Sequence, residues 1–314
     1  MKILLVNQAY YPDRVASAVY LTEYAEHVAR QGHDVTVLAS RFGYDDHKQV
    51  FRMSEKINGV KIIRTGSLTI SQGNRTARII NALFLNIAFA WKLMSFKKHD
   101  CVVAMTSPPL IAFVTLIFTH MKRGRFVYWL LDINPDQAIR AGWIQEKTFR
   151  THLLQKVLHF TLKGSDLIIV LDEYMKKNIV RKKIDSRKVK VHSLWPNSSN
   201  SRHYPSQSDL KKKMGLQDKF VVLYAGNHSV CHPLDTLLDC AKDFKDDSSV
   251  AFLFVGKCIR VDDVTRFKEA HNLSNIYQFD YQDSWQETLY LADLHVVIMG
   301  NDYVGMVHPC KIYN

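Results

Sequence analysis

The sequence has few cysteines and no arrangement of them that would form a disulfide framework or a zinc site. The five cysteines are odd in number and never form a CxxC pair; they stand singly at Cys101, Cys231, Cys240, Cys258 and Cys310. We therefore expect a reducing compartment. The chain also starts with only four consecutive apolar residues, residues 3–6 (ILLV), too few for the core of a signal peptide. These absences predict a protein that stays in the cytoplasm, where it is made.

Several motifs with well-defined chemistry are also missing. The sequence contains no GxGxxG, no P-loop GxxxxGK[ST], no GxSxG and no HExxH. This argues against a dinucleotide site, a P-loop NTPase, an α/β-hydrolase and a zinc peptidase. His228 and His232 are close together in the sequence, but no placed carboxylate accompanies them. We therefore expect no bound metal.

No apolar run reaches the roughly 18 residues that a membrane-spanning helix needs. Residues 79–96 (IINALFLNIAFAWKLMSF) are apolar nearly all the way round a helix but are interrupted by Asn81 and Asn86, and residues 108–121 form a shorter stretch. Cations flank both stretches, at Arg75, Arg78, Lys92, Lys97 and Lys98 and at Lys122, Arg123 and Arg125. For residues 79–96, a buried core helix and a helix in a membrane interface both stay open.

Acidic residues are scarce in the first two thirds of the chain. Residues 1–200 hold 30 Lys and Arg against 15 Asp and Glu, a formal charge of +15, whereas residues 201–314 hold 12 against 15, a charge of −3. The densest basic run, residues 176–190, has eight Lys or Arg, and an ordinary solvated face is its simplest explanation. The asymmetry predicts docking on an anionic surface. Because the basic run lacks interleaved aromatic residues, we expect a membrane and no nucleic acid.

Strand-like and helix-like segments alternate along the chain. Buried-strand patterns occur in KILLVNQ, DVTVLAS, VKIIRTG, DCVVAMTS, RFVYWLLD and DLIIVLD, and a first helix in AVYLTEYAEHVARQG. After the polar stretch SSNSRHYPSQS the alternation restarts with FVVLYAGN, VAFLFVG, NIYQFDY and LHVVIMG. We predict an α/β protein of two Rossmann-like domains, residues 1–200 and 201–314. The second has only about four strands, so we expect it to be incomplete at its C-terminal end.

In open α/β sheets, ligands bind beyond the carboxyl ends of the strands. Residues 11–18 (YPDRVASA) join the first strand to its helix with small side chains, which would let a ligand approach the helix N-terminus; a plain turn with Ser17 near the cap is the alternative. Residues 132–136 (DINPD) follow the strand RFVYWLL. We expect Asp132 to point into a cleft between the domains and to orient or deprotonate a substrate hydroxyl, although capping of the next helix explains it equally well.

In the second domain, small and polar residues follow three successive strands. Gly226 would let a phosphate approach backbone N–H groups near a helix that begins at about Leu234. The other candidates at these strand ends are Asn227, His228, Gly256, Lys257 and Tyr281, and a polar turn further on contains His308 and Lys311. Each of them alone has an ordinary explanation. Their joint occurrence predicts a nucleotide diphosphate site, with Lys311 neutralising the diphosphate.

The order of these motifs resembles the retaining glycosyltransferases of family 4, especially bacterial members that build surface polysaccharides. The resemblance covers the whole chain. RQGHDVTV (30–37) is similar to the family's "L..GHeVtV", DINPD to "D.wPd", GSDLIIV (164–170) to "aD.ii..S", and WPN (195–197) to "iPN". In the second domain GN (226–227), FVG (254–256) and LADL (291–294) resemble family landmarks, and HPCKIY (308–313) is similar to "vPsKly".

The resemblance implies a GT-B fold, an NDP-sugar held mainly by the second domain, an acceptor held by the first, retention at the anomeric carbon, and no cofactor or obligatory metal. Asp132 would be catalytic. The acceptor would contact Arg14, Ala16, Ser17 and Asp136. The donor would contact Gly226, Asn227, His228, His232, Gly256, Lys257, Tyr281, His308 and Lys311. Where many members have Arg and Lys in the phosphate loop this chain has Asn227 and His232, and Met306 and Asn314 stand where the family has paired glutamates.

These observations together predict a hexosyl- or N-acetylhexosaminyl-transferase of surface polysaccharide or lipopolysaccharide biosynthesis. Its partners would be a UDP- or GDP-sugar, a lipid-linked or glycan acceptor, and an anionic membrane surface on the cytoplasmic side. Two alternatives stay open. One is a nucleotide-sugar epimerase of the same fold, and the other is a peripheral membrane-binding protein without catalysis.

Overall fold

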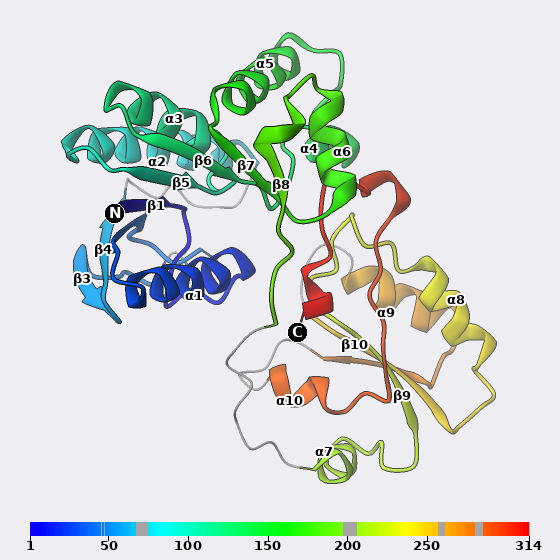
Figure 1. Cartoon of the computed structure of the whole chain (residues 1–314). Helices are drawn as coiled ribbons and strands as arrows, with labels where there is room; N and C mark the ends of the chain where they lie inside the picture. Colours follow the sequence, from blue (N-terminus) through cyan, green and yellow to red (C-terminus); the bar gives the residue numbers. More distant parts are fainter. Residues whose placement is uncertain are drawn as a thin grey trace. The chain divides into compact units, whose positions relative to one another are not determined.

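The computed structural model of the chain describes residues 1–44, 46, 48–66, 75–196, 206–256, 261–279 and 285–313. These residues divide into two compact units, each with its own parallel sheet (Figure 1). The first unit contains Met1–Trp195 and Gly305–His308, and the second contains Pro196–Val304 and Pro309–Asn314. The short segment Gly305–His308 therefore belongs to the first unit although it follows most of the second along the chain.

An eight-stranded sheet forms the centre of the first unit, in the order β3-β4-β2-β1-β5-β6-β7-β8. The strands are β1 (Lys2–Val6), β2 (Asp34–Ser40), β3 (Ser54–Ile57), β4 (Val60–Thr65), β5 (Cys101–Ala104), β6 (Arg125–Trp129), β7 (Leu167–Val170) and β8 (Val189–Val191). All neighbours are parallel except β3 and β4. Because β1 lies between β2 and β5, the direction of winding reverses beside it, and such a switch point leaves a crevice at the carboxyl ends of the strands.

The helices of the first unit are α1 (Ala16–Arg30), α2 (Arg75–Ser95), α3 (Ile111–Met121), α4 (Asp136–Arg140), α5 (Phe149–Gly164) and α6 (Glu173–Arg181). Helix α1 covers one face of the sheet, and α2, α3 and α5 cover the other (Figure 1). The helix α2 confirms the helical pattern of residues 79–96, and it buries Leu85, Phe89 and Leu93 against the unit. Among the described residues, no helix combines the length and the apolar character needed to cross a membrane.

The second unit has a four-stranded parallel sheet in the order β11-β10-β9-β12. Its strands are β9 (Phe220–Ala225), β10 (Val250–Val255), β11 (Ile276–Phe279) and β12 (Leu294–His295), and its helices are α7 (Gln207–Lys213), α8 (Asp235–Asp243), α9 (Val261–Ala270) and α10 (Trp285–Leu289). Here β9 lies between β10 and β12, so the winding reverses beside β9. Both units thus have the strand arrangement of a Rossmann-like domain.

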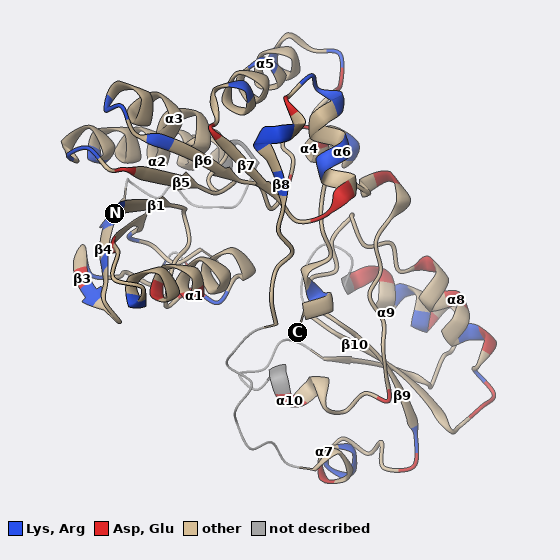
Figure 2. Cartoon of the chain, in the orientation of Figure 1, with Lys and Arg blue, Asp and Glu red and all other residues tan. Residues whose placement is uncertain are grey.

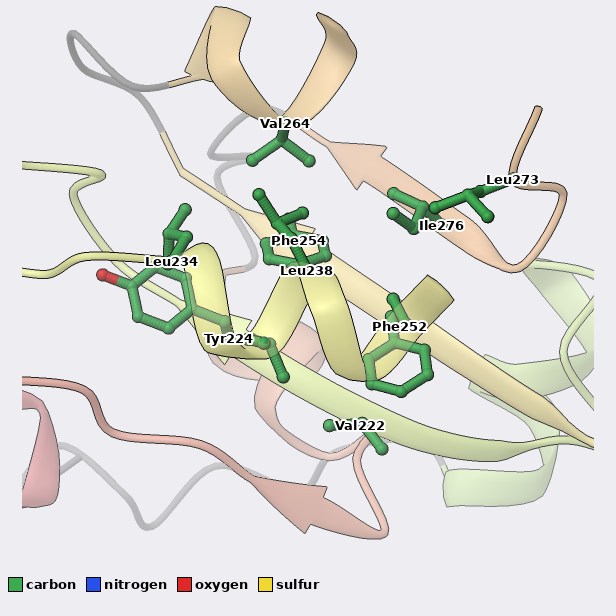
Figure 3. Packing of buried hydrophobic residues seen from close by; sticks show 11 residues of the cluster. Val222, Tyr224, Leu234, Leu238, Phe252, Phe254, Val264, Leu273 and Ile276 are labelled. Carbon is green, nitrogen blue, oxygen red and sulfur yellow. The ribbon is translucent and has the colours of Figure 1, made fainter. Parts of the chain in front are cut away.

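Both faces of the second sheet are buried. On one face Tyr224, Phe252 and Phe254 pack against Leu234 and Leu238 of the α8 region (Figure 3). On the other face an apolar cluster is formed by Leu210, Leu216, Val221, Leu223, Ala251, Leu253, Val255 and Leu291. Burial on both faces explains why these strands read as continuous apolar runs in the sequence.

Three strands differ from the sequence expectation. Strand β3 has a polar sequence, SEKI, and β8 is only three residues long, so neither has a clear hydrophobic pattern. The segment LHVVIMG was expected to form a full strand, but β12 stops at His295. The N–H of Val296 still donates to Leu223 of β9 (2.8 Å). Further on, the carbonyl of Ile298 accepts a hydrogen bond from the His232 ring (2.7 Å) and the N–H of Gly300 donates to Cys231 (2.9 Å), so these groups bond outside the sheet.

Candidate active site

Two glycines shape the turns that follow the adjacent strands β9 and β10. Gly226 has φ +129° and Gly256 has φ +150°, a region of backbone space that favours glycine. A Cβ atom on Gly256 would overlap the carbonyl oxygen of Gly226, and one on Gly226 would overlap the side chain of Lys311. Their own N–H groups donate to Val255 (2.8 Å) and Phe279 (3.1 Å). The glycines therefore allow the turns and Lys311 to pack closely, and their own N–H groups are already bonded.

Among the described residues, Lys311 is the one whose ammonium group lies at the turn of Gly226. Its Nζ atom lies 4.0 Å from the centroid of the Tyr224 ring, donates to the Tyr224 hydroxyl, and lies 3.2 Å from the carbonyl oxygen of Asn227. No carboxylate in the described part of the chain pairs with it. Burial lowers the pKa of Lys311 from 10.5 to about 7. Near neutral pH the Lys311 side chain is therefore only partly protonated, and an anionic ligand would favour its charged form.

His228 and His232 lie in the same turn and are both almost fully buried, with exposed fractions of 2% and 9%. Burial, and secondly the charge of Lys311, lowers the pKa of each imidazole to about 4. The His232 Nδ1 atom bonds to Ile298, but neither ring nitrogen of His228 has a partner among the described residues. Both rings are therefore neutral at neutral pH, and His228 has unused hydrogen-bonding capacity.

In the first unit, Asp132 follows strand β6. Its backbone pairs with Val307 of the segment Gly305–His308, which returns to the first unit. The next N–H group, that of Ile133, donates to the carbonyl of Met306 (2.8 Å). The residue as a whole is half-buried, and desolvation of its carboxyl group raises the pKa of Asp132 to about 6. Asp132 is thus a carboxylate whose basicity suits proton transfer near neutral pH. Its orientation towards a cleft between the domains stays a prediction.

Asp172 follows the neighbouring strand β7 in the same way, within the same Leu-Asp sequence as Asp132. It caps α6 by accepting the N–H of Met175 (2.7 Å), and its other oxygen lies 2.8 Å from Nδ1 of His308. Burial opposes ionisation, but the hydrogen bonds from His308 and Met175 outweigh it and keep the pKa of Asp172 below its usual value. His308, which the sequence grouped with the donor residues, therefore lies beside a carboxylate of the first unit.

The predicted acceptor residues lie in two places. Arg14 and Ala16 are exposed and Ser17 is half-buried, in the turn before α1 and at its start. Asp136 begins α4 and forms an ion pair with Lys182. The structure thus keeps the first three together at the carboxyl end of β1 and places Asp136 after β6. Whether they contact an acceptor stays a prediction.

Two polar residues near strand ends, Arg64 and Asp172, were not among the residues selected from the sequence. Arg64 of β4 is fully buried, forms an ion pair with Glu55, and donates to the carbonyl of Tyr11 (2.6 Å), so it fixes the turn after β1. The signal was available, because Arg64 takes an inward position in the alternating strand VKIIRT. Asp172 could have been found from its likeness to Asp132. Two predicted donor residues, Lys257 and Tyr281, lie outside the described residues.

Comparisons with known proteins identify the family and the fold of the chain. The sequence model of the family described as "Glycosyl transferase 4-like domain" matches residues 16–195. The chain is 20% identical over 329 aligned residues to WcaI of Escherichia coli strain K12, which is named for colanic acid biosynthesis as a glycosyl transferase; the match spans 100% of this chain and 80% of that protein.

Two solved structures have a similar fold. One is Anabaena HepE in complex with UDP and glucose, with a TM-score of 0.66 and 16% identity over 94% of this chain and 73% of that one. The other is WaaG, a glycosyltransferase involved in lipopolysaccharide biosynthesis, with a TM-score of 0.64 and 14% identity over 93% and 74% of the two chains. At this level of identity the likeness establishes the fold, which is that of GT-B glycosyltransferases.

Proposed function

Because the chain belongs to the glycosyl transferase 4-like family, we propose that it transfers a sugar from a UDP- or GDP-sugar to a hydroxyl group of a glycan or lipid-linked acceptor. We propose further that a hexose or an N-acetylhexosamine is transferred with retention at the anomeric carbon. The product would belong to a cell-surface polysaccharide or lipopolysaccharide. Support for this last point comes from the names of WcaI and WaaG, and support for a nucleotide donor from the UDP bound to HepE.

The observation that carries the proposal is the position of Lys311 over the Gly226 turn. An ammonium group without a carboxylate partner, in the described residues, lies at the carboxyl end of β9, beside the switch point of the second sheet. Switch points are where open α/β sheets bind nucleotides. A diphosphate at this place would receive a charge-assisted hydrogen bond from Lys311, while the neutral His228 ring offers an uncharged donor beside it.

In the proposed reaction, the bond between the anomeric carbon and the diphosphate oxygen breaks. The acceptor oxygen forms the new bond to that carbon and gives up its proton. Negative charge grows on the leaving diphosphate, and Lys311 would stabilise it. Asp132, with its pKa raised to about 6, would orient the acceptor hydroxyl and accept its proton.

We propose that the reaction takes place in the cytoplasm at the inner face of the cell membrane. The support is the charge of +15 in residues 1–200, since anionic lipids concentrate in the cytoplasmic leaflet. A lipid-linked acceptor would be presented at the same surface. Fractionation of cells that produce the chain, with and without a high-salt wash, tests this location.

Calorimetric titration of the chain with UDP, GDP and ADP, followed by their sugars, tests the donor site. We expect one uracil or guanine nucleotide to bind, and Lys311→Met to weaken its binding about tenfold or more, because a hydrogen bond to a charged group is lost. Lys245→Met is the matched control, since Lys245 is an exposed lysine of the same unit, in the loop after α8.

Nucleotide release on addition of acceptor glycans tests the transfer itself. Failure of every nucleotide and nucleotide sugar to bind would contradict the proposal. Conversion of an NDP-sugar into its epimer without release of the nucleotide would favour the epimerase alternative. If Lys311→Met and Lys245→Met bound the nucleotide equally well, Lys311 would not be part of the donor site, and the family assignment would not change.

A further inference from the structure

Two tyrosine side chains are exposed on neighbouring loops of the first unit. Tyr11 follows β1 and is 50% exposed, and Tyr44 follows β2 and is 39% exposed. Because β1 and β2 are adjacent and parallel, both loops leave the same edge of the sheet, at the carboxyl ends of its strands. The predicted acceptor residues Arg14, Ala16 and Ser17 lie in the same connection after β1.

Side chains of α1 and β4 hold the backbone of Tyr11. Its N–H donates to the hydroxyl of Thr22 (3.3 Å), and its carbonyl accepts a hydrogen bond from the guanidinium group of Arg64 (2.6 Å). The Arg64 side chain is fully buried and forms an ion pair with Glu55. A buried ion pair adds little net stability, because desolvation of both charges offsets their attraction. The structural effect of Arg64 is to fix the turn that presents the exposed ring of Tyr11.

Further hydrogen bonds join the two loops. The N–H of Tyr44 donates to a carboxylate oxygen of Asp13 (3.0 Å), and the N–H of Asp13 donates to the carbonyl of the buried Tyr10 (3.1 Å). The two exposed rings therefore belong to one surface whose backbone is already fixed. Binding residues are commonly carried on loops that a rigid scaffold positions, and a fixed backbone lowers the entropy that binding costs.

Charge of one sign does not dominate this surface. Residues 11–15 and 41–46 contain two Arg and three Asp, a formal charge of −1. Figure 2 shows Lys and Arg of the first unit gathered instead on α5, α6 and β8, and β8 is the edge strand furthest from β2 and β1 on that side of the sheet. An uncharged ligand therefore fits the two tyrosines better than a phosphate group does.

We propose that Tyr11 and Tyr44 form a stacking subsite for a pyranose ring of the acceptor. The C–H groups of a pyranose give it an apolar face that packs on an aromatic ring, while its hydroxyl groups stay in contact with water and with polar neighbours such as Asp13. This inference rests on the proposed transfer and deepens it. The acceptor already carries a sugar at this place, so the chain extends a glycan and does not begin one on a bare lipid.

Saturation-transfer nuclear magnetic resonance of the whole chain, without any donor, tests the subsite. The probes are the methyl glycosides of glucose, galactose, mannose and N-acetylglucosamine. We expect at least one to bind, and Tyr11→Leu and Tyr44→Leu each to weaken its binding about fivefold, since a flat aromatic face is lost. Tyr11→Phe keeps the ring and should keep the affinity. Tyr290→Leu is the matched control, because Tyr290 is 47% exposed but precedes β12, at the amino ends of the second sheet.

The changed side chains are all exposed, so the variants are expected to fold, and their thermal transitions check this. Calorimetry with UDP and GDP needs no glycoside, so it separates this inference from the proposed transfer, and all four variants should bind nucleotide like the unchanged chain. Binding of none of the glycosides, or equal binding by Tyr11→Leu and Tyr290→Leu, would overturn the inference and leave the donor site in place.

Two other results would also contradict the stacking subsite. Weaker nucleotide binding by Tyr11→Leu and Tyr44→Leu, with glycoside binding unchanged, would assign the two rings to the nucleobase of the donor. Glycoside binding by Tyr11→Phe as weak as that by Tyr11→Leu would show that the hydroxyl group, and not the aromatic face, makes the contact.

Discussion

Donor binding should weaken as the pH rises through about 7, because Lys311 loses its proton there. Burial lowers the pKa of this ammonium group to about 7, and in the described part of the chain no carboxylate pairs with it. His228 and His232, with pKa values of about 4, stay neutral over the same range. The diphosphate of a UDP-sugar has no proton left to lose near neutral pH. Lys311 is therefore the group expected to set the pH dependence.

The size of the effect follows from the pKa. If the bound diphosphate keeps Lys311 protonated, binding of the donor to the free site takes up a proton above pH 7, and the affinity falls tenfold for each further pH unit. Between about pH 6 and about pH 8 the Kd should therefore rise about tenfold. The stability of the unliganded second unit changes with pH in the opposite direction to the affinity for the donor. Its unfolded state binds more protons than the folded state between pH 7 and the ordinary lysine pKa of 10.5, so stability rises with pH in that window.

Calorimetry with a UDP- or GDP-sugar at three pH values, in two buffers of different ionisation enthalpy, measures both the affinity and the proton uptake. Lys311→Met should bind weakly at every pH and take up no proton. Lys311→Arg should keep a charge but lose the pH dependence, because a guanidinium group does not deprotonate in this range. A pH dependence of the same slope in Lys311→Met would refute the reasoning, since another group would then be titrating.

Three further effects are expected. Asp132→Asn should raise the stability of the first unit at neutral pH by about 1–2 kcal/mol, because a desolvated carboxylate is removed, and should lower sugar transfer; thermal unfolding and turnover measure the two. Gly256→Ala should lower the melting temperature of the second unit more than Gly215→Ala, because both have positive φ but only the first meets backbone atoms. The second unit should lose stability as the pH falls from about 6.5 to about 4, since His228 and His232 take up protons only on unfolding in that window; His228→Gln should reduce this slope in acid titrations followed by circular dichroism.

The sheets were largely predictable from sequence, because buried parallel strands are continuous apolar runs. Strand β2 (Asp34–Ser40) coincides with the expected segment DVTVLAS. The exceptions have physical causes. Strand β3 is antiparallel and half solvated, so its sequence is polar and gives no apolar run. Strand β12 is short, and from Ile298 on the backbone groups bond to His232 and Cys231 outside the sheet, which an apolar run in the sequence does not reveal.

The places of the candidate residues in the fold were predictable from the sequence, but their electrostatics were not. Rules for strand ends located Gly226, Lys311 and Asp132 because those rules need only the order of elements. They could not tell that Asp132 would be desolvated, since this depends on the returning segment Gly305–His308, which is far away in sequence. The grouping of His308 with Lys311 rested on adjacency in the sequence alone, whereas the chain passes from one unit to the other between them.

The hydrogen bonds around Lys311 leave one of its three donors for a ligand. An ammonium group has three N–H donors. One is directed to the Tyr224 hydroxyl and one to the Asn227 carbonyl, while the Tyr224 hydroxyl donates in turn to Asn227 (3.2 Å). The third donor can reach a phosphate oxygen without breaking these bonds. These contacts hold Lys311 in place, and the same burial lowers its pKa; an anionic ligand bound there would raise the pKa again.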